Sequence, residues 1–184
     1  MGDVEEISVI TAVLHPLRRR ILYYLRLHGA SQVTVLARGL DAQVGSISHH
    51  LRMMERAAVV ERADAPDGDG RASWWTLSRE KLSWSSADFD DSPADALLAR
   101  EAERQNIRGQ IERLQRYRRR PDDEIAEYQA FSTDTIGWAT PDELRDLQAR
   151  VTRTLDEWRD AVDTGDGRHR EPVFFFAHGF PTEI

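Results

Sequence analysis

The stretch that most constrains the fold is residues 36–60, LARGLDAQVGSISHHLRMMERAAVV. It predicts two short helices joined by a tight turn and followed by a β-strand. When successive residues are placed 100° apart, Ile47, Leu51 and Met54 fall on one face of the second helix. The opposite face carries Gly45, His49, Arg52 and Arg56, with Ser46 and Ser48 on its flanks. One face is therefore suited to packing, and the other presents small, hydroxyl and cationic side chains without a carboxylate.

The polar face of this helix has the chemistry of a DNA-reading surface. Small residues near the helix start let the backbone approach base edges, and Arg and Ser side chains donate hydrogen bonds to bases or phosphates. An ordinary amphipathic helix with a solvated outer face is the alternative interpretation. The polar face taken by itself would favour that alternative.

The whole string resembles the helix-turn-helix of the ArsR-type (arsenic-repressor-like) winged-helix transcriptional regulators. The matching positions are Leu36, Ala37, Leu40, Ser48, His50, Leu51, Met54, Ala58 and Val60. Ala58 departs from the pattern, because the family usually has glycine there. The resemblance implies a winged helix-turn-helix fold, binding to double-stranded DNA as a homodimer, and regulation of transcription.

The predicted DNA-contacting residues lie on the second helix, at its start and at the tip of the wing. Arg71 stands beside the turn-rich segment 65–70, where it could enter a minor groove or grip a phosphate. Asp64, Asp67 and Asp69 surround that tip and limit its contact with DNA. The full predicted set is Gln43, Gly45, Ser46, Ser48, His49, Arg52 and Arg71.

Hydrophobic spacing and breaker residues predict the other elements of the first half. Helices are expected near 3–13, 16–28, 33–39 and 44–57, with Ser31 capping the third. Strands are expected at 59–63 and 72–77, forming a β-hairpin wing. Arg18, Arg19 and Arg20 open the second helix, either as DNA-phosphate contacts or as a solvated helix start.

Charge and composition are uneven along the 184 residues, whose net charge is −7. Residues 1–82 hold 11 Lys and Arg against 10 Asp and Glu, a balance of +1, so the acidity lies in the second half. The chain has no cysteine, which excludes disulfides and thiolate metal sites and fits a cytoplasmic protein. No apolar run is long enough to cross a bilayer, and the acidic N-terminus is unlike a secretory signal.

The second half predicts a helical extension with a small α/β module. A long helix is expected at 94–118, a short one opens at Pro121, and Thr140-Pro141-Asp142-Glu143 is a capping box that starts an amphipathic helix. Segments 133–138 and 173–177 are expected to form strands. The aromatic residues of this half either line a pocket for a small-molecule effector or form the extension's own core and dimer contacts.

No catalytic constellation or metal-binding spacing occurs in the sequence. His49 and His50 are adjacent on a helix and point about 100° apart, and His28, His169 and His178 are scattered. The expectation is therefore no enzyme activity, no cofactor and no metal, although a site of His and carboxylate ligands stays open.

These features predict a mainly α protein with a β-hairpin wing. Residues 1–82 are assigned to a winged helix-turn-helix DNA-binding domain, and residues 83–184 to a C-terminal extension for dimerisation or effector binding. The predicted function is sequence-specific transcriptional regulation by a cytoplasmic homodimer on an operator. The alternative is a winged-helix protein-interaction module without DNA binding, suggested by the near-neutral first half. The operator sequence, the sign of regulation and the effector do not follow from the sequence.

Overall fold

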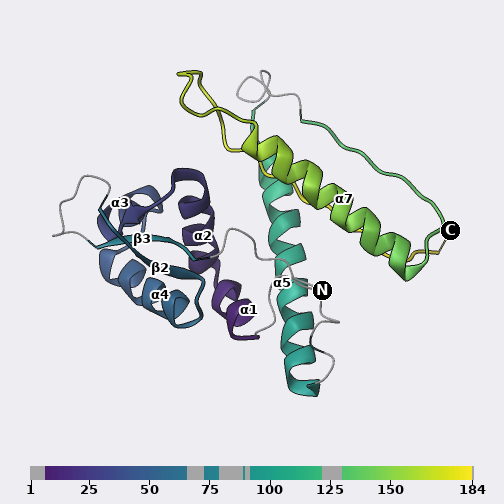
Figure 1. The fold of residues 1–184 in the computed structure, drawn as a ribbon, viewed down its shortest axis with the longest axis horizontal. Helices are drawn as coiled ribbons and strands as arrows, with labels where there is room; N and C mark the ends of the chain where they lie inside the picture. The colour runs from purple at the N-terminus through teal and green to yellow at the C-terminus, as the bar shows by residue number, and fades with distance from the viewer. Residues whose placement is uncertain (1–6, 66–72, 79–88, 90–91, 122–129, 184) are drawn as a thin grey trace. The chain divides into compact units, whose positions relative to one another are not determined.

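The computed structural model describes residues 7–65, 73–78, 89, 92–121 and 130–183. The chain divides into two compact units, Met1–Arg118 and Arg119–Ile184. The first is mostly helical and carries a small three-stranded antiparallel sheet (Figure 1). The predicted fold class, mainly α with a β-hairpin wing, is confirmed. Within the described residues, no helix is both long and apolar enough to span a membrane.

The elements of the first unit begin and end close to the predicted residues. They are α1 (Ile7–Leu14), α2 (Pro16–His28), β1 (Ser31–Gln32), α3 (Val33–Gly39), α4 (Val44–Arg56), β2 (Val60–Ala63), β3 (Trp74–Leu77) and α5 (Pro93–Tyr117). Pro16 and Pro93 each lie in the first turn of a helix, where the missing N–H costs no hydrogen bond. The wing tip, residues 66–72, lies outside the described residues.

The sheet contains one strand that the sequence did not predict. Its order is β1-β3-β2, and Ser31 pairs with Trp75 while Arg62 pairs with Trp75 from the other side. The prediction that Ser31 caps α3 was wrong. Ser31 is buried in β1 and its hydroxyl donates to the Gly29 carbonyl oxygen at 3.2 Å, so Gln32 becomes the N-cap of α3.

The core of the first unit lies where α2, α3 and α4 meet the sheet, and α1 packs against α2 and α4. Trp75 is 2% exposed, and Ile10, Ile21, Leu36 and Ile47 are fully buried with it. Trp74, the neighbour of Trp75 on β3, is only partly buried, because successive side chains on a strand point to opposite faces of the sheet. Ala96, Ala99 and Ala102 form the buried face of α5, and α5 packs against α1 of the same chain.

Two helix ends position the turn before α4 and the strand after it. Both α3 and α4 end in a Schellman motif. In this motif a residue with positive φ turns the chain, and two N–H groups donate to carbonyl groups of the last helical turn. After α3, Asp41 has φ of 46° and Ala42 N donates to Ala37 O at 2.9 Å. After α4, Ala58 has φ of 51° and Val59 N donates to Met54 O at 2.9 Å.

The second unit is described mainly through α7 (Pro141–Asp160), which the sequence predicted from its capping box. Thr140 Oγ1 accepts from Glu143 N at 3.3 Å, and Thr140 N donates to Glu143 Oε2 at 2.7 Å. The strands predicted at 133–138 and 173–177 were wrong, because neither segment forms strand pairing. The helix predicted to open at Pro121 falls largely outside the described residues.

The division at Arg118 places α5 with the first unit. This division concerns packing and does not assign functions. DNA binding by residues 1–82, and dimerisation or effector binding by residues 83–184, stay proposals.

Candidate nucleic-acid interface

The two faces of α4 have opposite exposure. Ile47, Leu51 and Met54 are each 0% exposed and hold the helix on the core. Gly45, His49 and Arg52 are exposed on the other side, and Ser46 and Ser48 are half-buried on the flanks. The helix therefore presents its predicted contact residues on one side, with their polar groups directed away from the packed face.

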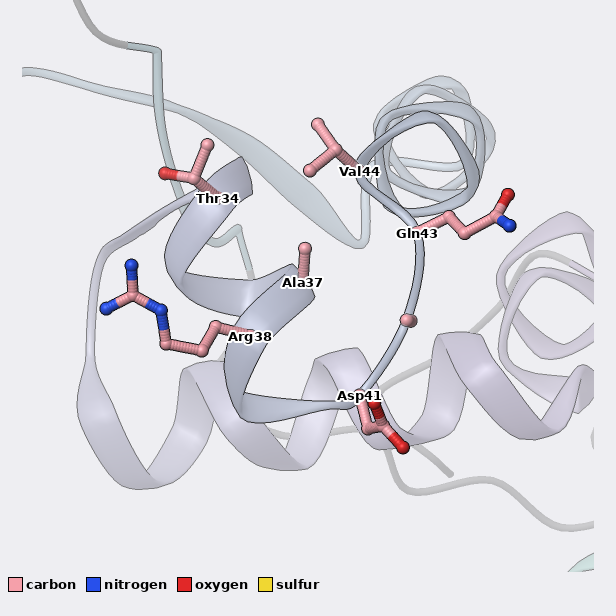
Figure 2. Close-up of a pocket in the computed structure, with 7 residues that line it drawn as sticks. Thr34, Ala37, Arg38, Asp41, Gln43 and Val44 are labelled. Atoms are coloured by element: carbon pink, nitrogen blue, oxygen red, sulfur yellow. The ribbon is translucent and has the colours of Figure 1, made fainter.

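The start of α4 borders a groove formed with α3. The groove has a volume of about 570 Å³ and is lined by Thr34, Ala37, Arg38, Asp41, Ala42, Gln43 and Val44. Gln43 is the N-cap residue, but its side chain makes no capping hydrogen bond and extends away from the other lining side chains (Figure 2). The first turn of α4 contains no acidic residue. Its free N–H groups and the positive end of the helix dipole together form a surface suited to phosphate.

An arginine from α2 holds the turn between α3 and α4. Arg20 Nη2 donates to the carbonyl oxygen of Leu40 at 2.5 Å. This is the C-terminal end of α3, where carbonyl groups lack helical partners and a cation is favoured. Arg20 therefore serves the geometry of the turn that places α4.

Glu55, a carboxylate on α4, is paired. Glu55 Oε1 lies 3.6 Å from Nε of Arg62 on β2, and the Arg62 guanidinium stacks 4.0 Å from the centre of the Trp75 ring. These contacts join α4, β2 and β3. They also place a cation beside Glu55, which reduces the repulsion that this carboxylate would exert on a polyanion.

The other side of α4 meets the start of α2 through a histidine pair. The rings of His15 and His50 are 4.4 Å apart, and the rings of His49 and His50 are 5.4 Å apart. Burial, followed by the charges of His15, Arg18 and His49, lowers the pKa of His50 below its usual 6.5. Burial and Arg18 also lower the pKa of His15. Lowering the pKa of both groups favours their neutral forms. His15 is exposed, and its Nδ1 accepts a hydrogen bond from Leu17 N at 3.1 Å, which caps α2.

The three consecutive arginines of α2 make contacts within the protein. Arg18 Nη2 donates to Thr11 O at 3.2 Å, Arg20 binds Leu40 O, and a Cβ added at Gly109 of α5 would lie 2.8 Å from Arg19 Nη1. Arg18 is half-buried and Arg20 is exposed, and each hydrogen-bonds within the protein, so a phosphate contact by either stays a prediction. Sequence reasoning missed these roles because each depends on a partner in or next to another helix.

The other predicted sites are the wing arginine, a metal site and an effector pocket. Arg71 lies outside the described residues. In the described part of the chain, no group of three or more His, Asp or Glu side chains lies close enough to hold a metal ion. Of the aromatic residues suggested for an effector pocket, Phe89 is buried in the first unit, whereas Phe131, Trp138 and Trp158 are 76%, 98% and 50% exposed.

The region from α2 to β2 matches a known protein family. Residues 15–62 match the family described as "Bacterial regulatory protein, arsR family". No curated protein matches the chain.

Solved structures similar to the chain include the following three. A double mutant of Lactococcus lactis ZitR in its apo form is 14% identical, with 80% of this chain and 86% of that chain covered and a TM-score of 0.36. A MarR family transcription regulator is 16% identical, with 86% and 82% covered and a TM-score of 0.37. The YusO protein from Bacillus subtilis is 12% identical, with 84% and 81% covered and a TM-score of 0.35.

Proposed function

We propose that this chain, whose residues 15–62 form an arsR-family helix-turn-helix domain, is a sequence-specific DNA-binding transcriptional regulator that acts on an operator as a homodimer. The observation that carries the proposal is the exposed side of α4. It combines a side-chain-free position, hydroxyls, an imidazole and a guanidinium on a helix anchored by three fully buried residues. Such a regulator works in the cytoplasm, where its DNA is.

In this proposal, the first half of α4 enters the major groove. Gly45 is exposed and has no side chain, so it lets the backbone approach the bases. Gln43, Ser46, Ser48 and His49 offer donors and acceptors to base edges and phosphates. Arg52 lies one turn beyond Ser48, where it can form a bidentate contact with guanine or clamp a phosphate. Arg71 is proposed for the wing contact.

The electrostatics of the first half favour specific over non-specific binding. Residues 1–82 carry a net charge of only +1, so the long-range attraction to DNA is weak. Local charge at the docking surface comes from Arg52, Arg56 and the start of α4. We therefore expect low affinity for random DNA and a shallow dependence on salt.

The homodimer is supported by the second half of α5. Ile107, Ile111, Leu114 and Tyr117 fall within about 120° of one another on the helix. Ile111 and Leu114 are each 44% exposed, although α1 covers the small residues of the first half. A second copy of α5 would bury this stripe. A two-fold dimer would then read half-sites about 34–36 Å apart.

Arg52→Ala tests the DNA-reading face. A selection from genomic fragments provides an operator, and gel shifts measure affinity at several salt concentrations. If Arg52 reads a base, the substitution weakens operator binding by about 1–3 kcal/mol and relaxes specificity at one position of each half-site. If it clamps a phosphate, binding weakens evenly across sequences and the salt slope falls by about one.

The matched control is Arg104→Ala, which removes the same charge from an exposed position on α5, where Arg104 pairs with Glu101 at 3.0 Å. Operator affinity should stay unchanged. An Arg52→Ala protein that binds like wild type while Arg104→Ala binds weakly would contradict the assignment of the α4 face. A protein that retains no fragment would instead favour the protein-interaction module, the alternative that the near-neutral first half suggests.

Light scattering tests the homodimer. The wild-type protein should show twice the 21.1 kDa chain mass at micromolar concentration. Leu114→Glu should shift it to the monomer mass, because a carboxylate would be buried unpaired. Gln115→Glu adds the same charge at the neighbouring exposed position and should leave the dimer intact.

A further inference from the structure

A pocket lies where α1, the first turn of α2 and the end of α4 meet. Its volume is about 380 Å³, and it is separate from the groove between α3 and α4. Its lining residues are Ser8, Thr11, Ala12, Arg18, Met53, Arg56 and Ala57. Two guanidiniums therefore share a pocket whose lining contains no carboxylate, and small or apolar side chains make up much of the remaining wall.

Arg18 is the first reason to expect an anion in this pocket. Its Nη2 donates to Thr11 O at 3.2 Å, and its Nη1 contacts Met53 Sδ, a weak acceptor, at 3.3 Å. Its Nε is buried without a hydrogen-bond acceptor among the described residues. Burial lowers the pKa of this guanidinium. A partly desolvated cation without a counter-charge is costly, and an anion that paired with it would recover that cost.

Arg56 is the second cation of the pocket. It lies in the last turn of α4 and is exposed. The negative end of the helix dipole favours a cation at this position, and that effect alone accounts for Arg56. It does not account for Arg18, which comes from the N-terminal turn of α2, where the dipole disfavours a cation. The helix dipoles therefore do not explain why Arg18 lines the same pocket as Arg56.

We propose that this pocket binds a small organic anion, a carboxylate or a phosphate monoester with a short apolar body. The planar fork of an arginine matches the oxygens of both groups. Ala12, Met53 and Ala57 offer the apolar wall that would cover the body of the ligand. The volume is near the lower end for small-molecule sites, which restricts the ligand to a compact molecule.

A ligand in the pocket would contact α4 directly, because Met53 and Arg56 of this helix line the pocket. The lining joins α1 to the last turn of α4, and α4 is about 20 Å long. An anion held by Arg18 of α2 and Arg56 of α4 would add negative charge at the end of the helix proposed to face DNA, so we expect it to lower operator affinity. This regulatory step, unlike the binding step, rests on the proposed DNA-binding function.

The binding step is tested without DNA. Backbone-amide NMR of the full chain follows titrations with benzoate, phenyl phosphate, benzamide and inorganic phosphate. Benzoate and phenyl phosphate should bind with Kd of about 1 mM or below, shifting the signals of Ala12, Arg18 and Met53. Benzamide, the neutral analogue of benzoate, should bind at least tenfold more weakly. Inorganic phosphate should also bind more weakly because it lacks an apolar body.

Variants locate the site. Arg56→Gln should weaken benzoate about tenfold without changing the melting temperature, because Arg56 is exposed. Arg18→Lys should weaken it similarly, because the charge stays but the fork is lost. Arg38→Gln is the control, since Arg38 is an exposed arginine on α3 that does not line this pocket.

The outcomes separate this proposal from the proposed function. Benzoate binding that Arg56→Gln weakens and Arg38→Gln does not supports the pocket, even if the protein binds no DNA. Equal binding of benzamide, or of inorganic phosphate, overturns the organic-anion class. Loss of operator affinity in Arg56→Gln without any benzoate binding overturns the pocket and assigns Arg56 to a DNA phosphate. If both DNA and benzoate bind, 10 mM benzoate should weaken the operator complex at least fivefold, with no such effect in Arg56→Gln.

Discussion

The helices α4 and α7 have similar apolar spacing but opposite surroundings. In α4, three apolar residues are completely buried, whereas α7, a helix of 20 residues, has no buried residue at all. Leu147 and Trp158 of α7 are each 50% exposed. An amphipathic pattern therefore predicts that a segment is helical, but it does not say what, if anything, covers the apolar face.

The two helices are also held by different kinds of contact. The hydrogen bonds and ion pairs described for α7 are short-range: the Thr140–Glu143 capping box, the Arg145–Asp142 pair and the Arg150–Asp146 pair at 2.7 Å. α4 relies on long-range packing and on the contact of Arg62 with Trp75 and Glu55. Local pairs on an exposed helix each add only tenths of a kcal/mol, so α4 should dominate the cooperative unfolding of the protein.

Truncation of one leucine in each helix should separate these two cases. Leu51→Ala should lower the free energy of unfolding by about 2–5 kcal/mol, because it leaves a cavity in a fully packed core. Leu147→Ala should change it by less than about 0.5 kcal/mol. Urea denaturation followed by circular dichroism measures both. Equal losses would show that α7 is buried against a partner in solution.

Glycine substitutions test the close packing of the first unit. A Cβ at Gly39 would lie 2.3 Å from a ring carbon of Tyr24, so Gly39→Ala should cost about 1–3 kcal/mol by overpacking. A Cβ at Gly45 meets nothing, so Gly45→Ala should be neutral or stabilise α4 by up to about 1 kcal/mol. Thermal denaturation compares the two.

Tyr24→Leu in the Gly39→Ala background provides the check on this explanation. The smaller side chain removes the ring atoms that the new methyl group meets, so part of the lost stability should return. A Gly39→Ala protein as stable as wild type would mean that Tyr24 moves aside without cost.

Sequence reasoning succeeded where the signal was local. Pro16, the Thr140 capping box and the apolar spacing of α4 each predicted an element whose limits the structure places within a residue or two. These signals involve neighbours within one or two helical turns, so no knowledge of the tertiary structure was needed to interpret them.

It failed where the partner was distant or absent. Ser31 resembled a helix cap, but pairing with β3 places it in a strand. The apolar segments 133–138 and 173–177 resembled strands, yet no pairing partner meets them. Arg18 and Arg56 line one pocket although they belong to two different helices. Their spacing in the sequence does not reveal that they lie together. The DNA-contacting set, including Arg71, stays a prediction from residue type and exposure.

The histidine pair should make the first unit sensitive to mild acid. The pKa values of His15 and His50 are lowered in the folded protein, so the unfolded chain binds more protons once the pH falls below about 6.5. The contribution of the two histidines to the free energy of unfolding is therefore fully present above that pH. It decreases as the pH falls towards the pKa values of the folded protein. Melting temperatures at pH 7.5, 6.5 and 5.5 should show this decrease.

His50→Gln should flatten that pH dependence, because it removes the more buried of the two rings. His169→Gln is the control in the second unit, where the His169 side chain is 79% exposed. Asp166 does not contribute in this range, since its hydrogen bonds with Arg170 lower its pKa to about 2. An unchanged slope in His50→Gln would rule out the pair as the source.

The last prediction concerns the two Schellman turns, one after α3 and one after α4. Ala58 has φ of 51°, a left-handed conformation that costs a residue with a Cβ about 1–2 kcal/mol. Ala58→Gly relieves that strain but increases the entropy of the unfolded chain, so the net gain should be about 0.5–1 kcal/mol. Thermal and urea denaturation should both show the increase.

Asp41→Gly is the matched comparison, because Asp41 holds the same position after α3 with φ of 46°. Aspartate tolerates this conformation better than alanine, since its short polar side chain can bond locally. The gain at Asp41 should therefore be smaller than the gain at Ala58. A larger gain at Asp41 would mean that repulsion between its carboxylate and a neighbouring group, and not backbone strain, limits the turn. Operator binding by Ala58→Gly should match wild type, because the turn after α4 lies at the opposite end from Gln43 and Gly45.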